Sequence, residues 1–391
     1  MNGTVPYWLD EPYEPRPPLR GRVEAEACVI GAGVAGVSCA LHLARHGVDT
    51  VLLERETVAS GASGRNGGFL IAGVAAFYND ARERYGHERA RRIYAATLEA
   101  QQQVLELAQE LGANDAVRRV GLLRASASEE EARHVRAHAQ ALQDDGFPAE
   151  FLEHSELPDG AARYAGNGVL TPHDAALHPA RCYRLLARAL DLAGARVFER
   201  TPVDAPIVAP EEGELVTSEG TVSARHVVVA ADGGLPTLIP EYARRVRARR
   251  LHMVATEPFA ERLGEPLVYS RFGYEYWHQR RDGRLLAGGF SDFDPDDGDV
   301  SSASPEVWRR IERFLRDDLA TEASVTHRWT GVVGYSDDGL PYVGEVPGRR
   351  GLYAMGGYSG HGNVPGFLAG REVADAIAGR ATALPLFDAS R

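Results

Sequence analysis

The sequence predicts an α/β fold, in which a Rossmann-like dinucleotide-binding domain is built from discontinuous segments and carries an inserted domain of mixed antiparallel sheet and helix. Three observations support this prediction. A glycine-rich β-α-β pattern occupies residues 25–53, and an α/β pattern returns at residues 351–378. Between them, residues 274–287 alternate in the manner of an antiparallel hairpin. One domain therefore interrupts the other.

The elements follow in order along the chain. Five prolines within the first 20 residues predict an extended arm over residues 1–24. A short apolar strand at residues 25–30 leads through glycines into a helix that ends near Gly47, and a second strand follows at residues 50–53. Further helices are predicted at 80–111, 128–143, 179–192 and 363–378, further strands at 195–199, 227–230 and 351–355, and a hairpin at 274–287 that turns at Asp282 and Gly283.

Composition limits the function classes. At roughly 150 residues per domain, 391 residues predict two or three domains. The net charge of −12 argues against nucleic acid or an anionic membrane surface as the main partner. All 43 basic residues are arginines, because the sequence contains no lysine. This excludes a lysine Schiff base with pyridoxal phosphate and a lysine-containing phosphate loop.

The cysteines and the apolar runs predict a cytoplasmic protein whose cysteines are small buried side chains in a reducing compartment. Cys28, Cys39 and Cys182 form neither a CxxC pair nor a zinc-ligand spacing, so no metal site is predicted. The longest apolar run, at about residues 69–77, is too short for a membrane span. The start of the chain lacks a basic segment followed by an apolar core. We therefore expect a cytoplasmic protein with no membrane span.

The first glycine motif predicts dinucleotide binding. Gly31 permits a tight turn, Gly33 allows the backbone to approach a diphosphate, and Gly36 allows the helix to pack closely on the sheet. The diphosphate would lie at the helix N-terminus, where free amides favour negative charge. Glu54 ends the second strand, 18 residues after Gly36, and its carboxylate would accept hydrogen bonds from ribose hydroxyls.

Two further glycine-rich loops favour FAD over NAD. Residues 62–68, with the sequence ASGRNGG, begin eight residues after Glu54 and predict a backbone clamp on the cofactor. Residues 356–362, with the sequence GGYSGHG, precede the last helix. A helix N-terminus directed at a flavin would stabilise the anionic reduced ring, and NAD enzymes have no general need for such an element.

These motifs, together with DGLPYVG at residues 338–344, resemble the FAD-dependent D-amino-acid oxidase superfamily, which includes glycine and sarcosine oxidases. The ASGRNGG loop and the arm containing Tyr7-Trp8-Leu9 are most similar to the gamma-glutamylputrescine oxidase branch. The resemblance implies an FAD-binding domain over residues 25–80, 165–245 and 326–391. It implies a substrate domain over residues 81–164 and 246–325, with residues 1–24 as the arm.

The resemblance and the motifs together give the candidate site residues. The candidates for contact with substrate are His361 in the last glycine loop and Tyr276 and Tyr274 on the hairpin, where Tyr274, Tyr276 and His278 are expected to share one face. The cofactor-binding candidates are Gly31, Gly33, Gly36, Glu54, Arg55, Ser63, Arg65, Asn66, Gly67, Gly68, Val203, Gly357, Tyr358, Gly360, His361 and Gly362.

The sequence also departs from the family pattern. Val333 stands where glycine oxidase-like members carry an arginine for the substrate carboxylate, so an α-amino acid is not required unless Arg65, Arg271 or Arg280 substitutes. No lysine is available near the flavin to activate oxygen. No cysteine follows Cys182 to tether the flavin, so FAD should be bound non-covalently. Asp232 stands where the family usually has glycine.

The resemblance implies an enzyme that oxidises the C–N bond of an amine or amino acid. Hydride would move to flavin N5, the imine would hydrolyse, and O2 or another acceptor would reoxidise the flavin. One alternative is an FAD-dependent 2-hydroxy acid dehydrogenase, because related folds oxidise C–O bonds. Another is a flavoprotein subunit of a larger complex, in which the N-terminal arm docks a second chain.

Overall fold

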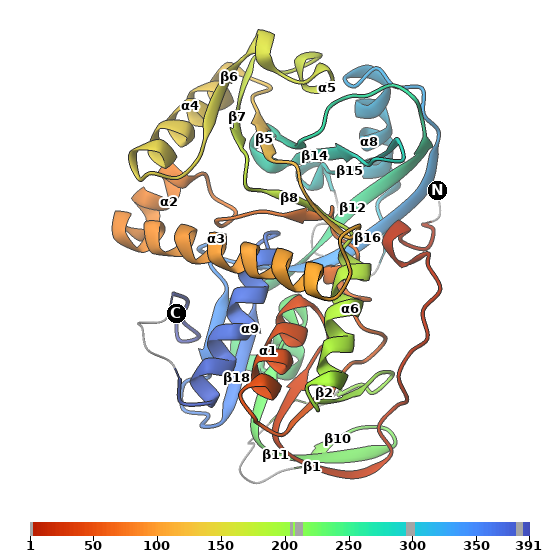
Figure 1. Cartoon of the computed structure of the whole chain (residues 1–391), viewed down its shortest axis with the longest axis vertical. Helices are drawn as coiled ribbons and strands as arrows, with labels where there is room; N and C mark the ends of the chain where they lie inside the picture. Colours follow the sequence, from red (N-terminus) through yellow and green to blue (C-terminus); the bar gives the residue numbers. More distant parts are fainter. Residues whose placement is uncertain (1–2, 204–205, 208–213, 295–301, 381–385) are drawn as a thin grey trace.

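The computed structural model describes residues 3–203, 206–207, 214–294, 302–380 and 386–391. Two large sheets lie in opposite halves of the molecule, and the long helix α3 (His87–Glu110) crosses between them (Figure 1). The predicted α/β fold with an antiparallel portion is confirmed. Within the described ranges, no helix combines the length and apolar character that a membrane crossing requires.

The first sheet has a parallel centre, as the sequence predicts. Its strands run in the order β17-β18-β11-β1-β2-β9, and β10 pairs with β11. The pairs β1·β11, β1·β2, β2·β9 and β11·β18 are parallel. The bounds are β1 (Gly21–Ile30), β2 (Thr50–Leu53), β9 (Arg196–Phe198), β10 (Leu215–Val216), β11 (Gly220–Val229), β17 (Tyr342–Glu345) and β18 (Leu352–Gly356).

Both faces of this sheet are buried, which explains why its strands are continuously apolar. Val29 and Val228 belong to the core beneath α1 (Val34–Arg45), α6 (Pro179–Leu192) and α9 (Asn363–Ile377). Their neighbours Cys28 and Val229 point to the opposite face. Packing of α1 on α9 is close, because a Cβ on Gly370 would lie 2.5 Å from the Ala35 carbonyl oxygen.

The second sheet is largely antiparallel, with the order β16-β12-β15-β14-β13-β5-β7-β6 and one parallel pair, β5·β13. Helices α4 (Glu129–Asp144) and α8 (Pro305–Asp317) accompany it. A small sheet of β3 (Phe69–Leu70), β8 (Ala175–Leu177) and β4 (Val117–Arg119) shares no strand pairing with either of them. The remaining strands are β5 (Leu122–Ala125), β6 (Glu150–Glu153), β7 (Asn167–Thr171), β12 (Val246–Pro258), β13 (Leu267–Ser270), β14 (Glu275–Gln279), β15 (Arg284–Gly289) and β16 (Val325–Ser336).

Two predicted elements differ from the structure. The helix predicted at residues 80–111 is divided into α2 (Tyr78–Tyr85) and α3, because Gly86 adopts a φ of 85° that a helix does not allow. The first strand begins at Gly21 rather than at residue 25, where β1 continues its parallel pairing with β11. Two short helices, α5 (Asp159–Ala162) and α7 (Leu235–Leu238), complete the set of α-helices in the described residues.

The described part of the N-terminal arm packs firmly against the body. It contains one turn of 3-10 helix at Tyr7–Leu9 and is otherwise irregular up to β1. The Trp8 side chain is fully buried, and its Nε1 donates a hydrogen bond to the Asn66 carbonyl oxygen at 2.7 Å. Farther along, the buried Glu199 carboxylate accepts hydrogen bonds from the Tyr13 hydroxyl and the Arg16 amide. The arm therefore supports the loop at residues 62–68.

The predicted domain boundaries remain a prediction, and sheet membership gives a reason to move two of them. β7 pairs with β5 and β6, although it lies in the predicted FAD-binding segment 165–245. β16 pairs with β12 along nearly its whole length, although it begins the predicted segment 326–391. Both strands supply hydrogen bonds to the larger sheet, so they are better grouped with the substrate domain.

Candidate functional site

The turn between β1 and α1 requires glycine at two positions. Gly31 has a φ of 100°, and a Cβ there would lie 2.6 Å from the Ala230 carbonyl oxygen. A Cβ on Gly36 would lie 1.8 Å from the Gly31 carbonyl oxygen. Gly33 occupies the N-cap of α1, and no side chain of its own caps the helix. No side chain of α1 itself therefore competes for the amides of its first turn, an arrangement that suits an anionic ligand.

Glu54 lies beside this turn at the end of β2. Its carboxylate accepts hydrogen bonds from the Ala32 amide at 2.7 Å and from the Glu56 amide at 2.9 Å. Burial raises the pKa of Glu54, and these backbone hydrogen bonds oppose the rise. The side chain is thus held at the edge of the glycine turn, where the dinucleotide motif expects it.

The loop at residues 62–68 is hydrogen-bonded to the first residues of both α1 and α9. The Ser63 hydroxyl accepts a hydrogen bond from the Val34 amide at 2.9 Å, at the start of α1. The Asn66 side chain donates to the Asn363 side chain at 3.1 Å, at the start of α9. Asn66 Oδ1 also accepts from the Gly68 amide at 2.8 Å. This loop therefore connects the N-termini of α1 and α9.

Two cavities adjoin this loop. The smaller, of about 80 Å³, lies between the start of α1, Ser63 and the glycine loop before α9. The larger, of about 240 Å³, extends from that glycine loop to the second sheet. The residues that line both cavities are Ala62, Asn66, Val333, Gly360, Gly362 and Asn363. The two spaces thus adjoin one another across a shared boundary and together form the candidate site.

Asp232 organises the boundary between the two sheets. Its carboxylate accepts hydrogen bonds from the Gly334 amide at 2.8 Å and the Gly357 amide at 3.0 Å, with a longer contact of 3.4 Å to the Tyr358 amide. Asp232 itself has a φ of 47°, a conformation that favours glycine. Asp232 therefore supplies the acceptor that holds amides of β16 and of the last glycine loop together.

The wall of the larger cavity facing the second sheet is aromatic and uncharged apart from its arginines. Tyr276 lines it from β14, together with Phe69 and Tyr269. His361 lines it from the last glycine loop, and neither of its ring nitrogens has a hydrogen-bond partner in the described structure. Burial lowers the pKa of His361 to about 3, so its imidazole is neutral at physiological pH.

The expected common face of the hairpin is only partly formed. Tyr274 lines the cavity, but it lies in a turn before β14, so its orientation does not follow from strand alternation with Tyr276. His278 lies on β14, where it is buried and contacts the Gly67 carbonyl oxygen through Nε2 at 3.0 Å. Burial lowers the pKa of His278 to about 3, so the neutral ring donates this hydrogen bond. His278 thus supports the loop at residues 62–68 from outside the cavity.

The structure brings most of the predicted site residues to these cavities. Those that line the larger cavity are Arg65, Asn66, Gly67, Tyr274, Tyr276, Gly360, His361 and Gly362, and those that line the smaller are Gly33, Ser63, Asn66, Tyr358, Gly360 and Gly362. Gly31, Gly36, Gly68 and Gly357 shape the backbone beside them, and Glu54 borders the turn. Arg55 is exposed on the surface, and Val203 packs against the core under the first sheet.

Sequence reasoning missed two groups at the site. Phe69 and Tyr269 belong to short apolar strands and lie outside every motif that the sequence shows. Arg124 lines the larger cavity from β5, whose four residues are all buried. An arginine that interrupts an otherwise apolar strand, Leu122-Leu123-Arg124-Ala125, was the available signal.

These features fit a dinucleotide. Cβ atoms would fill the turn at Gly31 and Gly36, α1 begins without a side-chain cap of its own, and the buried nitrogens of His361 lack partners. The first observation explains why the motif needs glycine at these positions, and the other two leave backbone amides and ring nitrogens available at the cavities.

Comparisons with known proteins point in the same direction. A family model described as FAD dependent oxidoreductase matches residues 26–376. The chain is 32% identical to a probable oxidoreductase OrdL from Rhizobium meliloti (strain 1021), over 95% of this chain and 87% of the relative. It is 28% identical to gamma-glutamylputrescine oxidoreductase from Escherichia coli (strain K12), over 96% and 88%. Glycine oxidase from Geobacillus kaustophilus superimposes with a TM-score of 0.78 at 25% identity, covering 94% of this chain and 99% of that structure.

Proposed function

The chain belongs to the family of FAD-dependent oxidoreductases, and on that premise we propose that it oxidises the C–N bond of an amine or amino acid. The names of two similar proteins support this proposal, since one is a gamma-glutamylputrescine oxidoreductase and another a glycine oxidase. The observation that carries it is the pair of adjoining cavities, one beside the glycine turn of α1 and the other beside an aromatic wall.

The smaller cavity is the proposed place of the diphosphate. Gly33 and the amides at the start of α1 would face it, and Ser63 would close it from the loop. Glu54 would hold the ribose from the edge of the turn. The last glycine loop and the N-terminus of α9 would lie beside the flavin ring, because they line the boundary between the cavities.

The larger cavity would hold the flavin ring and the substrate. When bound, the flavin supplies an acceptor for the hydride that leaves the carbon next to the amine nitrogen. Tyr276, Tyr274 and His361 would orient an amine that enters in its neutral form. His361 can donate or accept a hydrogen bond without a charge, since burial lowers its pKa to about 3.

Orientation supplies the chain's main contribution to the rate, and a protein base is not required once the amine is neutral. Loss of the hydride and of one proton from nitrogen converts the amine to an imine. Water then adds to the imine carbon and releases a carbonyl compound together with ammonia or a primary amine. The two electrons pass finally to O2, which becomes hydrogen peroxide, or to another acceptor.

We also propose that FAD is held without a covalent bond. Cys28, Cys39 and Cys182 are all buried, and none of them lines either cavity. Burial raises the pKa of the Cys28 and Cys182 thiols to about 12, so neither offers a thiolate at neutral pH. Acid precipitation of the purified holoprotein should release all of its flavin as FAD, and flavin retained in the pellet would contradict this proposal.

Product analysis tests the proposed reaction. The holoprotein is incubated under air, or with a redox dye as the electron acceptor. Primary amines, N-methyl amino acids, D-amino acids and 2-hydroxy acids are each added in a separate reaction. We expect hydrogen peroxide or reduced dye to form in equal amount with ammonia or a primary amine. Dye reduction by a 2-hydroxy acid, with no nitrogen compound released from any amine, would favour the dehydrogenase alternative. Glu54→Gln should retain less FAD through purification, because it weakens the ribose contact.

A further inference from the structure

Arg124 is a buried cation at the candidate substrate cavity. It lies on β5 with only 7% of its surface exposed, and its neighbours on the strand are apolar. It lines the larger cavity and also a second small cavity of about 20 Å³ behind that wall. A guanidinium in such a place needs acceptors for its five N–H groups or an anion for its charge.

The part of the chain that the structure describes supplies neither hydrogen-bond acceptors nor an anion for the Arg124 guanidinium. No hydrogen bond or ion pair in the described ranges involves the Arg124 guanidinium. Its contacts are with two rings: the Phe77 centroid lies 5.1 Å and the Tyr269 centroid 5.4 Å from the guanidinium carbon. Burial lowers the pKa of Arg124, which reflects the cost of keeping this cation out of water.

The nearest carboxylates are occupied by other donors. Asp174 accepts hydrogen bonds from the Ala72 amide, the Gln101 side chain and the Thr171 hydroxyl. Glu131 accepts them from backbone amides, those of Ala127 and Phe272 among them. Both acids lower the cost of the buried cation at a distance, but neither approaches it closely enough for an ion pair.

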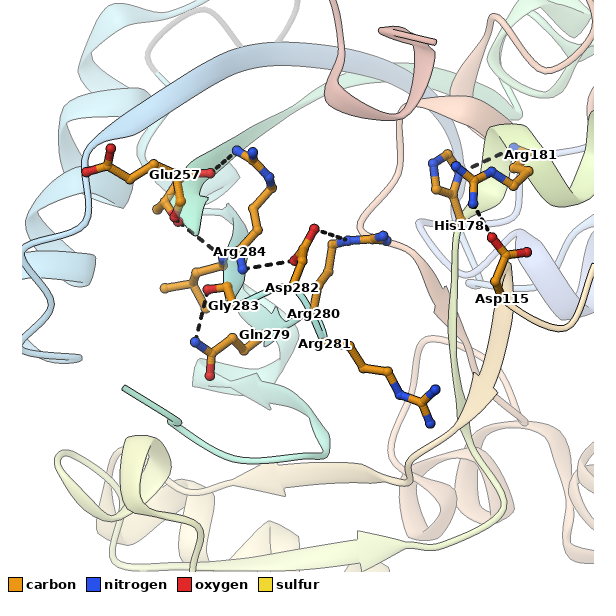
Figure 2. Close-up of polar contacts among 12 residues, drawn as sticks. Asp115, His178, Arg181, Glu257, Gln279, Arg280, Arg281, Asp282, Gly283 and Arg284 are labelled. Atoms are coloured by element: carbon orange, nitrogen blue, oxygen red, sulfur yellow. Dashed lines mark hydrogen bonds and ion pairs between the residues drawn. The ribbon is translucent and has the colours of Figure 1, made fainter. Parts of the chain in front are cut away.

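The three arginines that the sequence offered as carboxylate ligands, Arg65, Arg271 and Arg280, all have polar partners in the described structure. Arg65 donates to the Ser60 carbonyl oxygen at 2.6 Å. Arg271 forms ion pairs with Glu275 at 2.6 Å and Asp292 at 3.0 Å. Arg280 lies near Asp282 at the hairpin turn, 3.6 Å away, and does not line the cavity (Figure 2).

We propose that Arg124 binds the carboxylate of the substrate, and that the substrate is therefore an amine that carries a carboxylate. This inference rests on the proposed amine oxidation, and it assigns a specificity-determining residue to that reaction. A planar guanidinium matches a carboxylate through two parallel hydrogen bonds, and the pair gains strength in a dry cavity. A bound carboxylate would supply the negative charge that the described part of the chain does not place beside the Arg124 guanidinium.

Arg124 and Val333 lie at different walls of the larger cavity. Val333 lines the cavity from β16, at one end of the second sheet, and Arg124 lines it from β5, five strands away in the sheet order. The substrate carboxylate would thus lie at a different wall of the cavity from residue 333. The number of carbons between the carboxylate and the oxidised C–N bond is consequently set by the position of Arg124 rather than by that of residue 333.

The first test compares acids with their amides in the parent holoenzyme. The substrates are glycine, β-alanine and γ-aminobutyrate, each paired with its carboxamide. The value of kcat/KM is measured for every member of the series. At least one acid should exceed its amide by about 100-fold, since a neutral amide can accept a hydrogen bond but cannot neutralise a buried guanidinium. Equal values for every acid and its amide would overturn the assignment.

The second test needs no turnover. Acetate, propionate and butyrate are titrated into the holoenzyme, and Kd is obtained from the flavin absorbance and from the rise in Tm. Arg124→Gln should weaken the tightest of them by about 100-fold, while Arg124→Lys, which keeps the charge, should weaken it by about tenfold. The surface variant Arg119→Gln, whose side chain contacts Gln102, is the matched control and should bind like the parent.

The outcomes separate the two proposals. Unchanged carboxylate binding in Arg124→Gln, or in Arg124→Lys if the glutamine variant fails to fold, would overturn the assignment of Arg124. Failure of every amine to reduce the parent flavin would refute the proposed reaction. In that case a 100-fold loss of carboxylate binding would still assign an anion site to Arg124.

Discussion

Removing the Asp232 carboxylate should destabilise the junction between the two sheets. This carboxylate accepts two well-formed hydrogen bonds, from the amides of Gly334 and Gly357, and replacement by alanine leaves both amides without their acceptor. Each hydrogen bond to a charged acceptor contributes about 1.5–3 kcal/mol. Burial raises the pKa of Asp232, so dehydration cancels part of this gain and the lower value applies. Asp232→Ala should therefore lower the free energy of unfolding by about 3 kcal/mol.

Asp232→Gly should be less harmful than Asp232→Ala. The backbone at Asp232 has a φ of 47°, and glycine adopts this conformation without the cost of about 1 kcal/mol that a Cβ imposes. The expected loss is then about 2 kcal/mol. Because Asp232 also lines the smaller cavity, both variants should release FAD more readily.

Guanidinium denaturation in excess FAD, followed by tryptophan fluorescence, measures these differences. Asp337→Ala is the matched control, because Asp337 forms an exposed ion pair with Arg247 and its loss should change stability by less than about 1 kcal/mol. An Asp232→Ala protein that is as stable as the parent would show that the carboxylate does not hold the junction. Equal stability of Asp232→Ala and Asp232→Gly would show that the backbone at this position is not strained.

Three further predictions concern the cofactor loop, the arm and acid stability. Gly36→Ala should purify without FAD, because its Cβ would lie 1.8 Å from a carbonyl oxygen, whereas Gly61→Ala, with no atom within 4 Å, should retain it. Trp8→Ala should cost about 3–5 kcal/mol in denaturant titrations and weaken FAD retention, since it removes a buried ring and the hydrogen bond to Asn66. Between pH 3 and 6.5 the unfolded chain binds a proton on His361 that the folded chain does not, so stability falls as the pH falls. His361→Gln should reduce that slope by up to about 1.4 kcal/mol per pH unit, and an unchanged slope would contradict a buried neutral imidazole.

Local signals explain which elements could be predicted from the sequence. The helix α6 begins at a proline and both it and α9 end close to their predicted residues, because caps and periodicity act within a few residues. The break between α2 and α3 was missed, since a single glycine inside a helical pattern is usually tolerated. The extent of β1 was underestimated, because its first residues are polar and gain their structure from pairing with β11.

The same distinction holds for the candidate site. The glycine turn of α1 and the loop at residues 62–68 are each a short continuous motif, so the sequence alone identifies both of them as parts of one cofactor site. Arg124 and Tyr269 come together only because β5 pairs with β13, a contact between segments far apart in the chain. Asp232 had no sequence rationale, because its hydrogen-bond donors lie about 100 residues away on β16 and beyond β18. Such residues become visible only when the chain is folded.

Anaerobic reduction of the bound flavin tests the proposed oxidation of a C–N bond without the reoxidation step. Amines, N-methyl amino acids, D-amino acids and 2-hydroxy acids are mixed separately with the holoprotein in the absence of oxygen, and the visible flavin absorbance is followed. We expect rapid bleaching by an amine or amino acid, with one carbonyl compound formed for each flavin reduced. Bleaching by a 2-hydroxy acid alone, or by none of the four classes, would contradict it.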